Sequence, residues 1–321
     1  MEKFLTIIFV IVFEYCHSQP NYQTDTTIYS IDTRHECLVP KVEIGQKAIY
    51  KITKTDIEIE NGDTTKNEKK ENIFSYAITG KNDTAYFVEL KIDDEMWESI
   101  LFSKKQPNKN WHPEEVPQLI FQINNKGDRY ELTNCEEVYD YILPFMYGRT
   151  EYYRSTGETG SWMRHMESLP EKAKDCSFLS KIFTGELNFL HQLYGTPVPV
   201  DGILKYKIEK SHEGETDKIT LYMKVVKENL SKGNVKYQME EDREKGMTLQ
   251  DQFFEEMKEM AIRMDSTLAH QKIEMNSRDF NYLVFDKYNF PLKVYREINS
   301  VYIRGESKKE DFNFYEIEKV K

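Results

Sequence analysis

Apolar and polar side chains alternate strictly along several runs of this chain. In residues 86–93, every second side chain (Tyr86, Val88, Leu90 and Ile92) is apolar and those between are mostly polar. This alternation gives a strand one buried and one solvated face and is typical of antiparallel sheets. The same pattern covers 204–209, 219–225 and 235–239.

Turn signals accompany these runs. Asn61-Gly62 and Lys232-Gly233-Asn234 contain residues that tolerate a positive φ. We therefore expect antiparallel strands joined by tight hairpins at both places.

Helical patterns interrupt the strands between residues 134 and 194. Thr133 with Glu136, or Asn134 with Glu137, offers a capping box at the start of the first helix. Pro144 then predicts a kink or an early end of that helix, because its ring removes a backbone donor.

A second helix in this region should begin at Asp175, which can cap it. Gly195 and Pro197 predict its end. Its apolar stripe consists of Leu179, Ile182, Phe183, Leu187, Leu190 and Tyr194.

Residues 148–174 give no clear pattern and stay unassigned. Trp162 lies there with Met163, Tyr152 and Tyr153. These side chains either pack in the core or face a ligand or a partner.

A further amphipathic helix is expected over residues 249–265. Phe253, Met257, Met260 and Met264 share one of its faces. A methionine-rich face can be an adaptable binding surface, whereas an ordinary amphipathic helix packs its apolar face on a sheet. Both interpretations stay open.

These elements predict an α+β fold of mainly antiparallel, curved, half-barrel-like sheet, because strands with one apolar face need covering helices. We expect one β-rich domain over 45–321, with the helical segment 134–194 inside it. Gly45 to Lys54 and Gly202 to Lys210 share a short pattern. The domain could therefore consist of two similar halves, 45–133 and 199–321.

The N-terminus has the features of a secretory signal. Lys3 precedes an apolar run at 4–13, and Ser18 ends the polar stretch that follows. A helix of that run would be about 15 Å long, too short to span a bilayer. We expect cleavage after Ser18, an extended segment over 19–44, and export to the periplasm or the medium.

Composition favours a globular, acidic, exported protein. The 321 residues have a formal net charge of −11 and are 39% hydrophobic and 13% aromatic. The lysines are interspersed with carboxylates, so no basic stripe for nucleic acid exists. No later segment is long and apolar enough to span a membrane.

Cysteine usage allows one disulfide in an oxidising compartment. Cys37, Cys135 and Cys176 remain after signal cleavage, and any two of them could pair. Three buried thiols are the other possibility, and no C-x-x-C motif points to zinc or to redox catalysis.

The common catalytic and cofactor motifs are absent from the sequence. His212-Glu213 begins like a zinc-protease helix, but Thr216 stands where the second histidine must be. We predict no catalytic residues, no metal and no cofactor.

Two stretches are similar to known proteins. Residues 282–294 resemble a hairpin of the LolA/LppX-like exported lipid-binding proteins, in which an Asp-Lys turn (Asp286-Lys287) is followed by an apolar-Pro-apolar start (Phe290-Pro291-Leu292). Gly45-Gln46-Lys47 and 130–138 resemble uncharacterised exported proteins of the Bacteroidetes type. The first resemblance implies a curved antiparallel sheet wrapped on helices, with an apolar cavity for acyl chains.

The sequence leaves three functions open. The chain could be an envelope protein that binds a lipid-like or other apolar ligand, an interaction or structural module with an envelope protein partner, or an enzyme with an unrecognised site. For the ligand, the candidate residues are Phe253, Met257, Met260, Met264 and Trp162.

Overall fold

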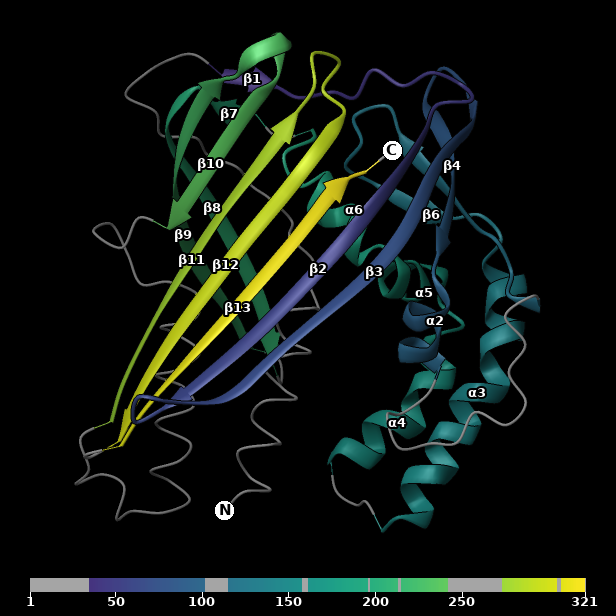
Figure 1. Cartoon of the computed structure of the whole chain (residues 1–321). Coiled ribbons are helices and arrows are strands. Elements are labelled where there is room, and N and C mark those ends of the chain that lie inside the picture. Colours follow the sequence, from purple (N-terminus) through teal and green to yellow (C-terminus); the bar gives the residue numbers. More distant parts are fainter. Residues whose placement is uncertain are drawn as a thin grey trace.

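A single large antiparallel sheet forms the body of the protein (Figure 1). The computed structural model describes residues 35–101, 115–157, 161–195, 197–212, 215–241, 273–304 and 307–320. The sheet is 11-stranded, in the order β6-β5-β4-β3-β2-β13-β12-β11-β10-β9-β8. The strands are β2 (Lys47–Glu60), β3 (Asp63–Lys81), β4 (Ala85–Ile92), β5 (Leu119–Asn124), β6 (Tyr130–Leu132), β8 (Asp201–His212), β9 (Glu215–Asn229), β10 (Val235–Glu241), β11 (Ile273–Phe285), β12 (Pro291–Arg304) and β13 (Ser307–Lys319).

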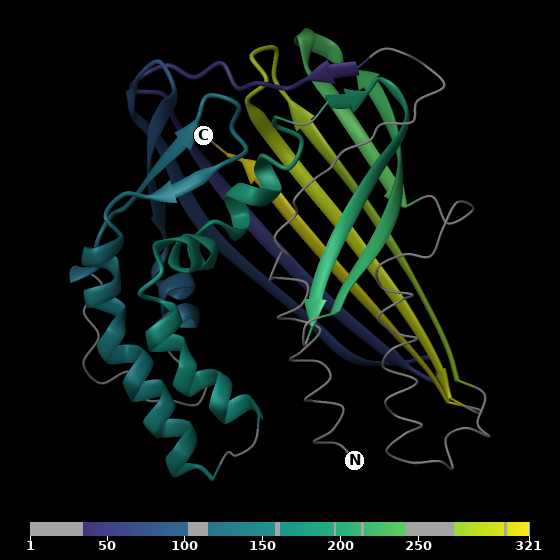
Figure 2. The same cartoon turned by 180° about the vertical axis from the view of Figure 1, so that it is seen from behind.

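The sheet consists of two meanders that meet at β2 and β13. Strands β2 to β6 form the first and β8 to β13 the second, and Ile52 of β2 lies opposite Ile317 of β13. The sheet is curved and open, with helices on one side (Figure 2). The expected α+β fold is therefore confirmed. The internal duplication stays a prediction.

Both predicted hairpins are present. Asn61 and Gly62 have φ values of 52° and 94° and connect Glu60 directly to Asp63. Lys232 and Gly233 have φ values of 61° and 75°, within the 3₁₀ turn η2 (Ser231–Gly233) between β9 and β10. Local turn chemistry thus determines the register of both strand pairs.

The strand alternation sorts side chains as predicted. On β4, Tyr86, Val88, Leu90 and Ile92 are buried. They belong to what we call the inner face of the sheet, which carries the helices; the opposite face is the outer face. The hydrophobic core lies between the inner face and the helices.

Among the described residues, five α-helices lie on the inner side of the sheet. They are α2 (Asp94–Leu101), α3 (Cys135–Ser155), α4 (Ser161–Lys172), α5 (Cys176–Phe183) and α6 (Gly185–Leu190). The unassigned segment 148–174 is thus mostly helical among the described residues, and Met163 is buried as the core reading expected.

The start of α3 differs in detail from the expected capping box. Asn134 is the N-cap residue, but its side chain makes no cap hydrogen bond. Its amide instead accepts from the Ile120 backbone N–H at 3.2 Å and donates to the Gln118 carbonyl. The side chain therefore attaches the helix to β5, and its bond to Glu137 (3.0 Å) is the part of the predicted pair that forms.

Pro144 does not end α3, so the prediction that this helix ends early at the proline was wrong. The helix continues to Ser155, and Thr150 beyond the proline is buried and donates to the Met166 carbonyl of α4 at 3.4 Å. Packing on α4 thus holds the second half of the helix despite a cost of about 3 kcal/mol for an interior proline.

Asp175 caps α5 as predicted, accepting from the Ser177 backbone N–H at 2.9 Å. The single long helix was wrong, however, because the chain breaks at Thr184 into α5 and α6. Gly185 follows the break, and glycine weakens a continuous helix. The helix ends at Leu190, before the expected Gly195.

A strap of residues 38–46 crosses one end of the sheet, after the short strand β1 (His35–Cys37) that pairs with β7 (Pro197–Pro199). Leu38 and Val42 of the strap enter the core. Of the predicted extended segment, residues 35–44 are described, and only His35–Cys37 of these form a strand. The signal segment 1–18 and residues 19–34 lie outside the described residues, as does the predicted helix 249–265.

Candidate functional site

Most of the predicted ligand-binding residues lie outside the part of the chain that the structure describes. Phe253, Met257, Met260 and Met264 lie outside the described residues, and Trp162 is described only as a backbone position in α4. The hypothesis that they bind an apolar ligand stays a prediction.

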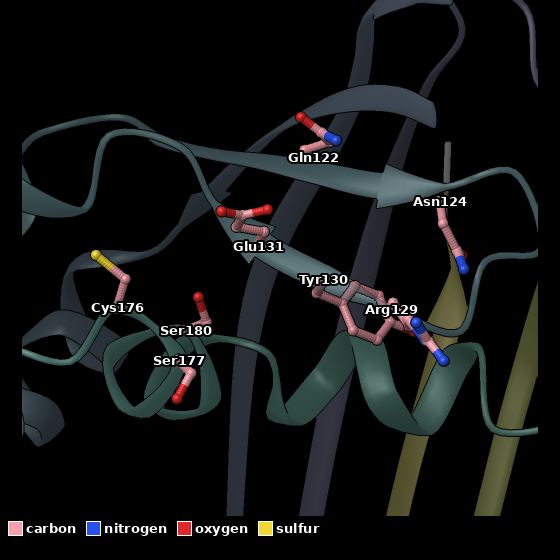
Figure 3. A pocket seen from close by; sticks show the side chains of 8 residues that line it. All are labelled: Gln122, Asn124, Arg129, Tyr130, Glu131, Cys176, Ser177 and Ser180. Atoms are coloured by element: carbon pink, nitrogen blue, oxygen red, sulfur yellow. The ribbon is translucent and has the colours of Figure 1, made fainter. Parts of the chain in front are cut away.

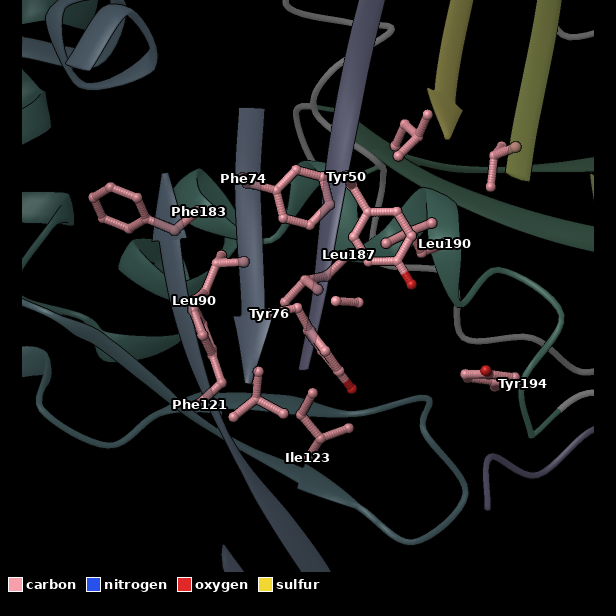
Figure 4. Close-up of a cluster of buried hydrophobic side chains, with 14 of the residues drawn as sticks. Tyr50, Phe74, Tyr76, Leu90, Phe121, Ile123, Phe183, Leu187, Leu190 and Tyr194 are labelled. Carbon is pink, nitrogen blue, oxygen red and sulfur yellow. The ribbon is translucent and has the colours of Figure 1, made fainter. Parts of the chain in front are cut away.

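Figure 4 shows buried side chains of the first meander together with those of α5 and α6. Tyr50 stacks on Phe74 with ring centroids 5.1 Å apart, and Tyr76 contacts the Phe290 ring edge-on at 5.9 Å. These aromatic contacts belong to the hydrophobic core between the first meander and the helices. The ten labelled core residues are Tyr50, Phe74, Tyr76, Leu90, Phe121, Ile123, Phe183, Leu187, Leu190 and Tyr194.

His191 lies inside this packed core. Its ring stacks on Tyr130 (5.8 Å between centroids) and contacts Tyr194 (4.7 Å) and Tyr76 (6.0 Å). Burial lowers the pKa of the imidazole from 6.5 to about 3, although a hydrogen bond to the Gly127 backbone opposes the shift. The ring is neutral at physiological pH and is too enclosed to serve as a base for a substrate.

Polar groups interrupt the apolar inner face on β11 and β12. Asp279 and Asn281 are each only 8% exposed, and Arg296 lies beside them on β12. The Arg296 Nε–H donates to both carboxylate oxygens of Asp279, at 3.0 and 3.1 Å, and its Nη2 also contacts the carboxylate. This bidentate pair neutralises the buried charge.

Asn281 has no comparable partner. It lies opposite Arg296 in the strand ladder, yet its side-chain oxygen is buried and makes no hydrogen bond. A buried acceptor without a partner costs about 1–3 kcal/mol. Such a group in a native protein calls for an explanation, and a ligand donor is one.

Apolar side chains surround this amide. Met239 lies opposite Asn281 on β10, and Leu283 and Val294 form the next cross-strand pair on the same face of β11 and β12. All three are buried. Phe189 of α6 lies 5.7 Å from the Arg296 guanidinium. We call Asp279, Asn281 and Arg296, with these neighbours, the inner polar site.

Farther along the strands, the inner face becomes charged. The Nζ atom of Lys309 on β13 lies 2.9 Å from Oε2 of Glu58 on β2 and 3.4 Å from Oδ1 of Asp311 on β13. Burial, with a smaller contribution from Glu58, raises the pKa of Asp311, while Lys309 opposes the shift. The inner polar site thus lies at the boundary between an apolar and a charged zone.

A hollow of about 440 Å³ lies on the β5–β6 hairpin beside α5 (Figure 3). Its potential nucleophiles are already engaged: Ser177 donates to Asp175, Ser180 accepts from the Leu132 backbone N–H at 3.0 Å, and Cys176 is in a disulfide. The hollow therefore has no free nucleophile paired with a base. Its lining is Gln122, Asn124, Arg129, Tyr130, Glu131, Cys176, Ser177 and Ser180.

The disulfide joins Cys135 to Cys176 and leaves Cys37 as a free, exposed thiol. It connects the first residues of α3 and α5. Among the described residues, no group of three or more His, Cys, Asp or Glu side chains could hold a metal ion.

Sequence reasoning missed the inner polar site. Asp279 and Asn281 stand two residues apart on one strand, which could have marked a polar spot on a strand face. Their neighbour Arg296 is separated from them by a hairpin, and only the register brings it close.

Comparisons with known proteins give this chain no family. No protein-family model matches it. No curated protein matches it either.

Proposed function

We propose that this protein is a non-catalytic, exported binding protein that takes an amphipathic, lipid-like ligand at the inner polar site. The observation that supports this is the buried, unpartnered oxygen of Asn281 among Met239, Leu283 and Val294. A ligand hydroxyl or amine would donate to that oxygen, and its apolar part would contact the apolar neighbours.

The resemblance of residues 282–294 to LolA/LppX-like proteins agrees with this proposal. That family implies a curved antiparallel sheet with helices and an apolar ligand. The run contains Leu283 and Val294, which border the inner polar site. We place the ligand on the second meander because the buried, unpartnered oxygen of Asn281 lies there.

Native mass spectrometry of the protein from its own exported fraction, without detergent, tests the proposal. We expect extra mass that dissociates on denaturation and corresponds to a lipid or another amphipathic molecule. Asn281→Leu removes the acceptor while keeping the side-chain volume, and should abolish the extra mass.

Asn299→Leu is the matched control. Asn299 also has a buried side-chain oxygen without a hydrogen bond, but strand alternation places it on the outer face of β12. It should keep the bound mass. A bare wild-type mass, or equal loss in both variants with both folded by circular dichroism, would overturn the proposed site.

A further inference from the structure

Several exposed apolar side chains lie at one end of the sheet. Among the described residues, seven large hydrophobic side chains are exposed, and four of them lie at the end that the strap crosses. These are Val39, Ile44, Tyr288 and Val320, with exposed fractions between 38 and 64%. The other three, Ile73, Tyr147 and Val226, lie on β3, α3 and β9.

Hydrogen bonds hold Val39, Tyr288 and Val320 at the same end. The Lys41 N–H donates to the Tyr288 carbonyl at 3.1 Å, and the Asn289 side chain donates to the Val39 carbonyl at 3.1 Å. The Val320 N–H donates to the Ile49 carbonyl at 2.8 Å, near the start of β2. Figure 1 shows the strap and the β11–β12 hairpin at this end. We call residues 38–47, 286–290 and 318–320 the rim.

The rim is anchored, so its apolar side chains cannot simply fold inward. Leu38 and Val42 already fill the core from the strap, and Phe290 does so from the hairpin. The Gly45 N–H donates to the Ile78 carbonyl at 2.9 Å and fixes the strap beside Ile44. Val39 and Ile44 therefore stay exposed because their neighbours hold the backbone in place.

The charge of the rim differs from that of the whole chain. It contains the lysines 41, 47, 287 and 319 and the acids Glu43, Asp286 and Glu318, which gives 4 − 3 = +1 against −11 for the complete chain. The Asp286 carboxylate accepts from two backbone N–H groups, of Tyr288 and Phe290. The Lys287 ammonium lies 4.9 Å from the Tyr288 ring centroid.

We propose that the rim docks on an anionic phospholipid bilayer. Lysines attract anionic headgroups, tyrosine suits the interface between headgroups and acyl chains, and aliphatic side chains insert below it. The four apolar side chains stand singly on separate segments. A fluid bilayer accommodates separate insertions, whereas a rigid protein partner needs a continuous complementary surface. The proposal goes beyond ligand binding and does not require it.

Flotation with vesicles of phosphatidylglycerol and phosphatidylethanolamine tests the rim, with phosphatidylcholine vesicles for comparison. The rim variant carries Val39→Ser, Ile44→Ser, Tyr288→Ser and Val320→Ser. We expect its affinity for anionic vesicles to be at least about tenfold lower than that of the wild type. The matched control carries Ile73→Ser, Tyr147→Ser and Val226→Ser, whose side chains are 41 to 56% exposed, and should bind like the wild type.

Every replaced side chain is exposed, so both variants should fold, and thermal unfolding verifies this. In addition, Tyr288→Trp should be quenched by brominated lipids, while Tyr147→Trp should not. Wild-type protein that does not float with anionic vesicles overturns the proposal, as does equal loss of binding in both multiple variants. Rim-dependent binding to an envelope protein without any binding to vesicles would overturn it as well.

Discussion

Acid should destabilise this protein through the buried imidazole of His191. Burial among Tyr76, Tyr130 and Tyr194 lowers its pKa from 6.5 to about 3 in the folded state. In the unfolded chain the imidazole titrates near its ordinary pKa of about 6.5. Between the two pKa values the unfolded state binds more protons than the folded state, so stability falls as the pH falls.

The size of the effect follows from the two pKa values. A pKa difference of one unit corresponds to about 1.4 kcal/mol, so His191 alone should lower the free energy of unfolding by about 2 kcal/mol between pH 7 and pH 5. Other groups also titrate, and the raised pKa of Asp311 acts in the opposite direction. The comparison with a variant that has no imidazole removes these contributions.

Urea unfolding at pH 7 and pH 5 provides the assay. His191→Phe keeps an aromatic ring against Tyr130, and His191→Gln keeps an uncharged polar group. Both should lose about 2 kcal/mol less than the wild type between the two pH values, whatever their stability at pH 7. If the wild type and both variants change in parallel, the imidazole is not responsible and the reasoning is wrong.

Three further predictions concern stability. Replacing Cys135 and Cys176 by Ala should lower the free energy of unfolding by about 4 kcal/mol in the loop-entropy account, because their sequence separation is 41; denaturant unfolding with and without reductant checks this. Asp279→Ala should cost about 3–5 kcal/mol because it removes the carboxylate that is paired with the Arg296 guanidinium, whereas the double change with Arg296→Met should recover most of that loss; a double-mutant cycle measures both. Gly62→Ala should lower the melting temperature by a few degrees, because φ is +94° there, and calorimetry would detect it.

The strands could be predicted because their signals are local. On β4, Val88, Leu90 and Ile92 are buried, whereas Lys91 is exposed. The period-two pattern of the sequence therefore matches the burial pattern of the strand. The Asn61-Gly62 turn needs only its own two residues to adopt positive φ. In each case the information lies within a few residues of the structure that it specifies.

The helices were harder to predict because tertiary contacts decide their ends. The sequence around Pro144 does not indicate that α3 continues. The second half of α3 is supported by Thr150, which packs on α4. Asn134 has the right residue type for a cap, but β5 uses its amide. The pairing of Cys135 with Cys176 likewise depends on where α3 and α5 begin in space.

Strand β11 shows why the inner polar site escapes sequence reasoning. By hydrophobicity alone, Phe280 and Tyr282 should face inward and Asn281 outward. The structure does the reverse: Leu283, two residues beyond Asn281, is fully buried, and Tyr282 stacks on Tyr295 on the outer face, with ring centroids 5.2 Å apart.

The register explains this orientation. The hairpin at 286–290 fixes Leu283 opposite Val294, and a one-residue slip would reverse the faces of every residue along β11. With that register, Asp279 must be buried, and Arg296 offsets its charge. Asn281 is left with a buried oxygen that makes no hydrogen bond, as Asn299 is on the outer face. Such uncompensated groups are expected where function rather than stability determines the residue. We place ligand binding at Asn281 rather than at Asn299 because Met239, Leu283 and Val294 give Asn281 apolar neighbours on the inner face.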